Sequence, residues 1–287
     1  MTLTPPPAPI LDAVLRSALA EDLGQRGDIT TDAILSADAG ARGAIVARVP
    51  GRIAGLSMAL QTFELLDHTV SFEMLAVDGD EVTAGQTLMN IDGAARAILT
   101  GERVALNLLG RLSGIATATA AFVDAVQGTG ASILCTRKTT PGLRALEKYA
   151  VRAGGGCNHR FGLYDAVLIK DNHIAIAGGV AEAIELVRRR SRTSVPCRIE
   201  VEVDSLAQLE QALAAGVDAV LLDNMDVSSL ARAVAMVDGR ATTEASGGIT
   251  LETAAAVAQT GVDYLSIGWL THSAPSLDVG LDITRLP

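Results

Sequence analysis

Aromatic residues are scarce in this chain: Phe, Tyr and Trp make up 3% of its 287 residues, while hydrophobic residues as a whole reach 49%. The core must therefore be built mainly from Ala, Val, Leu and Ile, which fill stacked layers of strands and helices. A chain of this length forms one large domain, or a large domain with a small one. The composition favours a folded α/β protein over a disordered or fibrous one.

Signals for export and for membrane insertion are also missing. The N-terminus MTLTPPPAPI has no basic stretch followed by an apolar segment, and no run of 18 apolar residues occurs in the chain. We therefore expect a soluble, cytoplasmic protein.

Cysteine is rare: Cys135, Cys157 and Cys197 form no CxxC pair and have no histidine at zinc-ligand spacing. Neither a disulfide framework nor a zinc site is expected, and the compartment is predicted to be reducing.

Lysine occurs only three times, in a chain whose net charge is −10. This negative charge argues against binding to nucleic acid or to anionic membranes. The positive charge is nevertheless concentrated, because all three lysines share one segment with four arginines: Arg137, Lys138, Arg144, Lys148, Arg152, Arg160 and Lys170. The concentration indicates a pocket for a small anion. An alternative for the charged residues of 144–152 is a solvated helix face, since they recur at helical spacing.

From about residue 131 the sequence alternates between short apolar strands and amphipathic helices. Helix 205–215, for example, has Ser205 to cap its start and Gly216 to cap its end. Six βα steps imply a parallel sheet with helices outside it. The predicted strands span 133–139, 166–171, 198–204, 219–224, 241–246 and 264–268.

A (β/α) barrel is the first choice for this half of the chain, and a doubly wound sheet is the second. The segments AGVDAVLLDN and TGVDYLSIGW echo each other, as expected where every unit is the same supersecondary step. Both architectures place the chemistry at the carboxyl ends of the strands.

The part before residue 131 has a different pattern. It predicts a capped helix near 9–20, short strands near 43–56 and 70–91, and helical stretches from about 95 to 127. We therefore divide the chain into an N-terminal α/β domain with a helical linker, 1–130, and a catalytic barrel, 131–275. The C-terminal tail is free to pack back onto the first domain.

Carboxylates alternate along the predicted strand RIEVEVD, with Glu200, Glu202 and Asp204 on one face. The next strand ends in Asp223. Carboxylates at the ends of neighbouring strands are suited to Mg²⁺, which takes one or two of them together with phosphate oxygens. The alternative is structural ion pairing with Arg137, Lys138 or Lys170, and both can hold at once.

Anion-binding signals follow several predicted strands. ASGGIT, residues 245–250, joins a strand to a helix that Thr250 can cap, so its glycines allow backbone N–H groups to approach a phosphate. Gly268 ends the next strand, and the last strand loops of barrels often bind phosphate.

Arginine pairs with carboxylates and lysine serves as a compact charge, which suits a substrate carrying both carboxylate and phosphate. The ATP and NAD motifs GxxxxGK[ST] and GxGxxG are absent. The cationic strand ends and loop contribute Arg137, Lys138, His159, Arg160, Lys170, Asp171 and His173.

Nearly the whole chain resembles the quinolinate phosphoribosyltransferase family. The strings that carry the resemblance are GERVALNLLGRLSGIAT, TRKTTPGLRALEKYAVRAGGGCNHRFGLYDAVLIKDNH, EVEVDS, AVLLDN, SGGI and GVDYLSIG. The resemblance implies a small open α/β sandwich followed by an incomplete α/β barrel, in a homodimer that shares its sites and can assemble further. It also implies that quinolinate reacts with phosphoribosyl pyrophosphate to give nicotinate mononucleotide, pyrophosphate and CO2 in NAD biosynthesis.

The resemblance also implies roles for individual residues. Lys138 lies between the two substrates, and Asp171 is near the metal. Glu202 and Asp223 hold Mg²⁺, and with Lys138 and Lys170 they form the catalytic set. The quinolinate carboxylates are surrounded by Arg103, Arg137, His159, Arg160 and Lys170, and the 5-phosphate is received by Ser246, Gly247, Gly268 and His272.

Two positions depart from the family pattern. Cys135 stands where the family has aspartate before TRKT, which removes a charge partner for Arg137 from that position. Trp269 replaces a small residue beside Gly268, where it either narrows the pocket mouth or packs outward.

Three other functions remain open. A phosphate-binding barrel aldolase or lyase would use Lys138 or Lys170 as a Schiff-base nucleophile. A phosphoribosyltransferase-like protein linked to molybdenum transport is a closer alternative than the aldolase or lyase, although the KDNH and NHR strings favour the quinolinate enzyme. A non-catalytic metabolite sensor would explain the cationic pocket but not the carboxylate pair.

Overall fold

The computed structural model describes residues 3–191 and 198–286, which form two compact units. The first unit comprises 1–120, 139–155 and 270–287, and the second comprises 121–138 and 156–269. The sequence instead divided the chain at residue 130 and assigned 131–275 to the barrel. Cys197 lies outside the described residues, and neither Cys135 nor Cys157 forms a disulfide within the described part of the chain.

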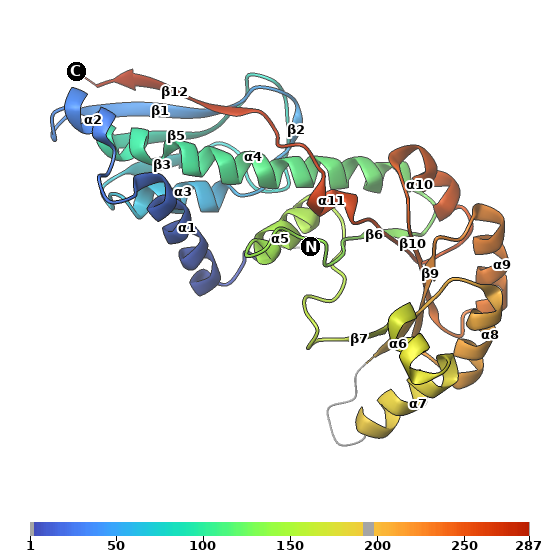
Figure 1. The fold of residues 1–287 in the computed structure, drawn as a ribbon. Helices are drawn as coiled ribbons and strands as arrows, with labels where there is room; N and C mark the ends of the chain where they lie inside the picture. The colour runs from blue at the N-terminus through green and yellow to red at the C-terminus, as the bar shows by residue number, and fades with distance from the viewer. Residues whose placement is uncertain (1–2, 192–197, 287) are drawn as a thin grey trace. The chain divides into compact units, whose positions relative to one another are not determined.

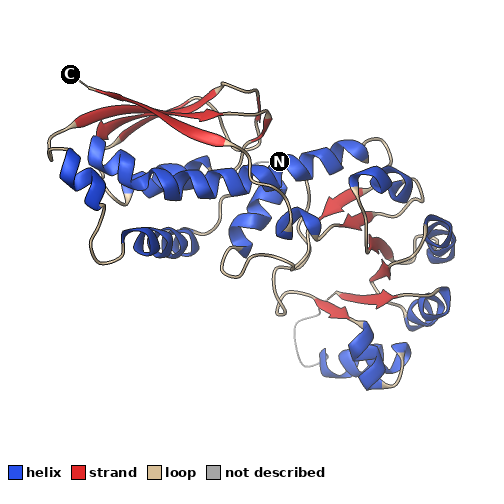
Figure 2. Ribbon diagram, turned by 45° about the horizontal axis from the view of Figure 1, so that its top comes forward, coloured by secondary structure: helices blue, strands red, loops and turns tan. Residues whose placement is uncertain are grey.

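The first unit is built on a four-stranded antiparallel sheet in the order β12-β1-β5-β3, and Figure 2 shows helices along one face of it. The C-terminal strand pairs with β1, Ala41 opposite Arg285. A two-stranded ribbon, β2-β4, completes the unit. Its elements are α1 (Ala8–Leu23), α2 (Ile29–Ile34), β1 (Gly40–Ala47), β2 (Gly51–Arg52), α3 (Leu56–Glu64), β3 (Ser71–Met74), β4 (Glu81–Val82), β5 (Thr87–Ala94), most of α4 (Ala95–Ala125), α5 (Arg144–Ala153) and β12 (Val279–Arg285).

The core of the first unit lies between this sheet and helices α3 and α4. Ile45 and Ile91 from the sheet, with Phe63 and Ile98 from the helices, are fully buried there. By length and composition α4 could cross a membrane, yet 67% of its most apolar window is buried inside the protein. That burial is the pattern of a core helix.

Helix α5 joins the first unit through buried polar contacts. Glu147 is fully buried and accepts hydrogen bonds from Arg111 Nη2 at 2.9 Å and from the Thr140 hydroxyl at 2.8 Å. The Tyr149 hydroxyl donates to Asp78 at 2.6 Å, and burial followed by this hydrogen bond raises the pKa of Tyr149. Because Glu147 and Lys148 are 0% and 1% exposed, the solvated helix face is the wrong interpretation for both.

The second unit contains a six-stranded, all-parallel sheet in the order β6-β11-β10-β9-β8-β7 (Figure 1). Its elements are β6 (Ser132–Leu134), β7 (Val167–Ile169), α6 (Asp171–Ala177), α7 (Val180–Ser191), β8 (Ile199–Val203), α8 (Leu206–Ala215), β9 (Ala219–Asp223), α9 (Val227–Val237), β10 (Thr242–Ser246), α10 (Leu251–Ala258), β11 (Tyr264–Ser266) and the start of α11 (Trp269–His272).

This strand order decides between the two predicted architectures. From β7 to β11 each strand lies beside the next one in the chain, and β6 follows β11, as in a barrel; a doubly wound sheet would reverse direction in the middle. Strands β6 and β7 are the two edges of the described sheet, so the barrel is incomplete. The predicted fold class, an open α/β sandwich with an incomplete barrel, is confirmed.

Local sequence signals account for much of this unit. Ser205 caps α8 by accepting from the Gln208 N–H at 3.4 Å, and Gly216 ends the helix in the left-handed conformation, both as predicted. Thr250 precedes α10 as its N-cap. The first strand is shorter than predicted, ending at Leu134 instead of 139, so Arg137 and Lys138 lie in the loop after it.

Candidate active site

Strand β8 presents its carboxylates to the barrel interior. Its burial alternates, with Ile199, Val201 and Val203 buried and Glu200 and Glu202 partly exposed between them, as the sequence predicted. Hydrophobic residues at every second position pack under the surrounding helices, which leaves the glutamates on the other face.

Lys170 follows β7, the neighbouring strand, and its ammonium forms an ion pair with Glu202. The structural ion pair considered for these carboxylates is therefore confirmed for Lys170. It also argues against Lys170 as a Schiff-base nucleophile, because that chemistry needs a free amine.

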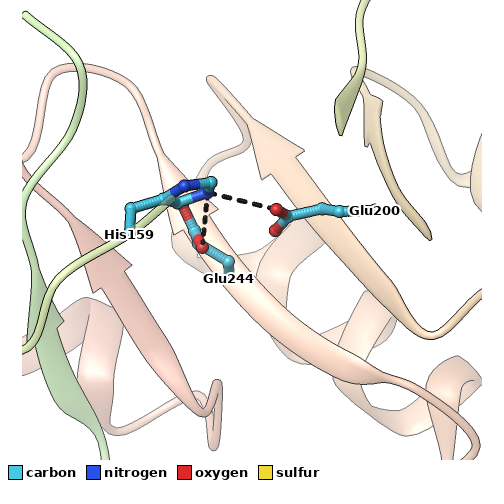
Figure 3. A group of neighbouring side chains, drawn as sticks. All are labelled: His159, Glu200 and Glu244. Carbon is cyan, nitrogen blue, oxygen red and sulfur yellow. Dashed lines mark ion pairs between the residues drawn. The ribbon is translucent and has the colours of Figure 1, made fainter. Parts of the chain in front are cut away.

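A second cluster lies on the same sheet and joins His159 to two glutamates (Figure 3). His159 Nε2 is 3.1 Å from a carboxylate oxygen of Glu200 on β8 and 3.6 Å from one of Glu244 on β10. Glu244 is only 4% exposed. Burial, followed by the negative charge of Glu200, raises the pKa of Glu244 to about 7.

The ligand atoms of His159, Glu200 and Glu244 lie within 4.8 Å of one another, close enough to hold a metal ion. The histidine argues against one. The backbone N–H of Arg160 donates to His159 Nδ1 at 2.7 Å, so in a neutral ring the proton is on Nε2. A metal-bound histidine instead donates its second N–H to an acceptor. The arrangement therefore favours a hydrogen-bonded cluster over a metal centre.

Arg137 and Arg160 supply positive charge beside these carboxylates. Burial, followed by the charge of Arg137, lowers the pKa of Arg160, while Glu200 and Asp165 raise it. Arg160 Nη1 donates to the carbonyl of Ala166 at 3.1 Å. The Nε atoms of both arginines are buried without a hydrogen-bond partner. Unpaired buried donors cost about 1–3 kcal/mol each, which favours an anionic ligand that would accept from them.

Asp223 ends β9 beside Ser246, the last residue of the neighbouring parallel strand β10. The amide of Asn224 donates to the Asp223 carboxylate at 2.7 Å, and the Asn224 N–H donates to the carbonyl of Ser246 at 2.9 Å. Asn224 takes the left-handed conformation at φ 54°. Gly247 has φ 96°, and a Cβ there would collide with the Asn224 side chain. The Asn224 side chain therefore orients the Asp223 carboxylate, and its position requires glycine at 247.

Glu202 and Asp223 end up on adjacent strands, β8 and β9, at the same edge of the sheet. Both offer hard carboxylate oxygens, the donors that Mg²⁺ prefers. The donor set therefore fits the predicted magnesium, together with oxygens from a phosphorylated substrate.

The other predicted site residues of the barrel unit lie in loops or at element ends. Lys138 is exposed, and its N–H donates to Thr136 Oγ1 at 3.0 Å. Asp171 is exposed at the start of α6. Gly268 follows β11 and is partly buried.

Two predicted site residues belong to the first unit. Arg103 lies on α4 with 64% of its side chain exposed and its guanidinium 3.6 Å from Glu102. It lines a cavity of about 400 Å³ with Asn107 and Asp278. His272 ends α11, exposed, with Nδ1 2.6 Å from the Ser273 hydroxyl.

The two unusual positions both find partners within the barrel unit. The thiol of Cys135 is buried and donates to Asn158 Oδ1 at 3.3 Å, a neutral hydrogen bond at a position where the resemblance led us to expect a carboxylate. Trp269 is 41% exposed and stacks obliquely on Phe122, with ring centroids 6.3 Å apart.

Sequence reasoning missed Glu244 and Asn224. Glu244 is the one charged residue in the strand ATTEAS, where a buried position should be apolar, and that contrast was an available signal. Asn224 follows Asp223 directly, and asparagine tolerates the left-handed conformation better than most residues.

The fold and this site define a class: barrel enzymes that bind a small anionic substrate at the carboxyl ends of their strands. Comparison with known proteins narrows it. Models of the N-terminal and C-terminal domains of quinolinate phosphoribosyl transferase match residues 28–113 and 115–282. The chain belongs to the quinolinate phosphoribosyl transferase family.

Individual relatives agree over nearly full length. A nicotinate-nucleotide pyrophosphorylase [carboxylating] of Mycobacterium leprae is 50% identical over 94% of this chain and 95% of the relative. A probable one of Bacillus subtilis is 45% identical over 96% and 93%. The crystal structure of NadC from Streptococcus pyogenes superposes with a TM-score of 0.93 at 43% identity, covering 100% of both chains.

Proposed function

We propose that this enzyme transfers a phosphoribosyl group from phosphoribosyl pyrophosphate to quinolinate, with loss of CO2, to give nicotinate mononucleotide and pyrophosphate for NAD biosynthesis. One observation carries the proposal: Arg137 and Arg160 offer buried, unpartnered Nε donors beside a row of carboxylate-bearing strand ends. Two guanidinium groups match a substrate with two carboxylates, and the carboxylate row matches a metal-bound phosphorylated one.

Positioning and charge would do most of the catalysis. The arginines would hold the two carboxylates so that the pyridine nitrogen faces C1 of the ribose. The nitrogen would attack C1 as the bond to pyrophosphate breaks, and the ring would become cationic. The 2-carboxylate would then leave as CO2, because its electron pair stays on a carbon next to the positive nitrogen and is then protonated. Lys138 would lie between the two substrates.

Magnesium belongs to this proposal as a cofactor held by Glu202 and Asp223, with Asp171 nearby. When bound, it would neutralise the pyrophosphate leaving group. Lys170 forms an ion pair with Glu202, so metal and lysine would share that carboxylate. Ser246, Gly247, Gly268 and His272 would receive the 5-phosphate.

The same proposal includes a homodimer whose sites take Arg103 from the partner subunit, and a cytoplasmic location. Arg103 has an exposed side chain on α4, which leaves it available for such a contact. Both remain predictions.

The test is to incubate the purified protein with quinolinate, phosphoribosyl pyrophosphate and Mg²⁺ and to follow nicotinate mononucleotide and CO2. Turnover should stop with EDTA, and Glu202→Gln and Asp223→Asn should weaken it far more than Glu210→Gln on α8. Nicotinate should be a poorer substrate by roughly a hundredfold or more, because one carboxylate leaves buried cations unpaired. Turnover of a carbonyl substrate through a borohydride-trappable adduct, or saturable binding with no turnover, would favour the lyase or the sensor instead.

A further inference from the structure

The cluster of His159, Glu200 and Glu244 has no assigned role as a unit. We propose that Glu244 is a positioning residue: with Glu200 it fixes the ring of His159, and His159 in turn holds the backbone of Arg160 in the dicarboxylate site. The inference rests on the proposed function, since it assigns Arg160 to substrate binding.

The first step is that both ring nitrogens of His159 have partners within the protein. Nδ1 accepts the Arg160 N–H at 2.7 Å, and Nε2 faces Glu200 at 3.1 Å and Glu244 at 3.6 Å. A ring held at both nitrogens orients its neighbours, and has no free nitrogen with which to bind a substrate carboxylate. His159 therefore serves the site through Arg160.

The second step concerns what holds the ring. Glu200 alone could accept the Nε2–H, but a glutamate at 13% exposure beside a second, almost fully buried glutamate is a repulsive pair if both are charged. Glu244 relieves this as a neutral acid, in keeping with its raised pKa, because it can then donate to Glu200. The groups facing Glu244 are Glu200 from β8, His159 from its loop and the Ser266 hydroxyl from β11.

The third step links the ring to Arg160. This residue is held at its N–H by His159 and at Nη1 by the carbonyl of Ala166, and Nε remains buried and unpartnered. The backbone N–H groups of Phe161 and Gly162 donate to Asp165 at 2.6 and 3.0 Å, which closes the loop behind it. If the His159 ring were no longer fixed, the hydrogen bond from the Arg160 N–H to His159 Nδ1 would be lost.

The structural test reads the histidine directly. The chain has four histidines, so a two-bond ¹H–¹⁵N spectrum of ¹⁵N-histidine protein can be assigned with a His159→Gln variant. The Nε2–H tautomer is expected in the wild type and in Glu244→Gln, with tautomer averaging in Glu244→Leu. An Nδ1–H tautomer in the wild type, or an unchanged spectrum in Glu244→Leu, would overturn the proposal whether or not the protein turns over quinolinate.

The functional test separates binding from chemistry. Glu244→Leu should raise the KM for quinolinate about tenfold, the size expected for a loosened charged hydrogen bond, and leave the KM for phosphoribosyl pyrophosphate unchanged. Glu244→Gln is neutral and keeps a donor, so it should restore the wild-type KM within about twofold. Glu210→Leu, on the exposed side of α8, is the matched control.

The two proposals fail in different ways. A wild-type protein inactive with quinolinate contradicts the proposed function, while the tautomer experiment still decides the role of Glu244. An active wild type whose Glu244→Leu variant keeps the KM for quinolinate, or whose Glu244→Gln variant is as impaired as Glu244→Leu, contradicts the positioning role alone. If Glu244→Leu does not fold, Glu244→Met takes its place.

Discussion

Among single residues, Glu244 should give the barrel unit an identifiable response to pH. Its pKa is about 7 in the folded protein against an ordinary 4.5, so the unfolded chain gives up this proton more easily. The contribution of the neutral acid to stability is complete below about pH 4.5 and is lost as pH rises to about 7.

Glu244→Gln removes this titration. Relative to the variant, the wild type should lose on the order of 3 kcal/mol of unfolding free energy between pH 4.5 and 7, and little beyond. Urea denaturation at a series of pH values measures it, with Glu210→Gln as the control. A constant difference between wild type and Glu244→Gln across that range would show that Glu244 does not titrate there.

Gly247 is a second residue whose identity follows from its surroundings. Gly247→Ala places a methyl group against Asn224, whose amide orients Asp223, so the variant should need several-fold more Mg²⁺ for half-maximal activity. Gly248→Ala isolates backbone strain, because Gly248 has φ 61° but no atom within 4 Å of its Cβ position. Equal magnesium requirements in the two variants would mean that the contact with Asn224 does not affect magnesium binding.

Some of the contacts in the site could be predicted from the sequence, and others could not, for physical reasons. Alternation along RIEVEVD placed Glu200 and Glu202 on one face because the period of a strand is local. The contact between His159 and Glu244 depends on how a loop and β10 meet in space, which no local period encodes. The full burial of Glu147 likewise depends on Arg111, far away in the chain.

Among elements, α4 shows how a helix can depend on having no side chain at certain positions. A Cβ on Gly114 would collide with the carbonyl oxygen of Pro275, and one on Gly110 would lie 2.9 Å from that of Leu277. Gly114→Ala should destabilise the first unit by about 3 kcal/mol or more, although alanine favours a helix by about 1 kcal/mol. Gly110→Ala should be milder. Circular dichroism during urea denaturation gives both values, and a stabilised Gly114→Ala would refute the close packing.

Element prediction succeeded where signals were strong and failed where elements were short. Helix 205–215 was recognised because serine and glycine cap it, and it is observed at Leu206–Ala215. Helices α2 and α3 were missed, since six and nine residues give little periodicity, and α3 begins at Leu56, where a predicted strand ended. Strand β6 was drawn too long because TRKT is compatible with a strand, whereas the chain leaves the sheet after Leu134.

At the scale of the whole molecule, the proposed shared sites make a quantitative prediction. If Arg103 serves the partner's barrel, inactive Arg103→Ala and Lys138→Ala subunits should complement, because a mixed dimer collects both changes in one site and neither in the other. Random exchange of equal amounts should restore about a quarter of wild-type activity. Subunits are exchanged in mild denaturant and assayed for product. No recovery in confirmed mixed dimers would place Arg103 outside the partner's site.

The pairing of β12 with β1 also affects how this chain is made. On the ribosome, β1 and β5 emerge early and can pair, but the other edge of β1 must wait for residues 279–285. Until then that edge carries unpaired N–H and C=O groups, the kind of surface that recruits strands from other chains. Residues 279–285 follow all the barrel strands in the chain, so a nascent chain that stalls before them would have the barrel strands and an open first sheet.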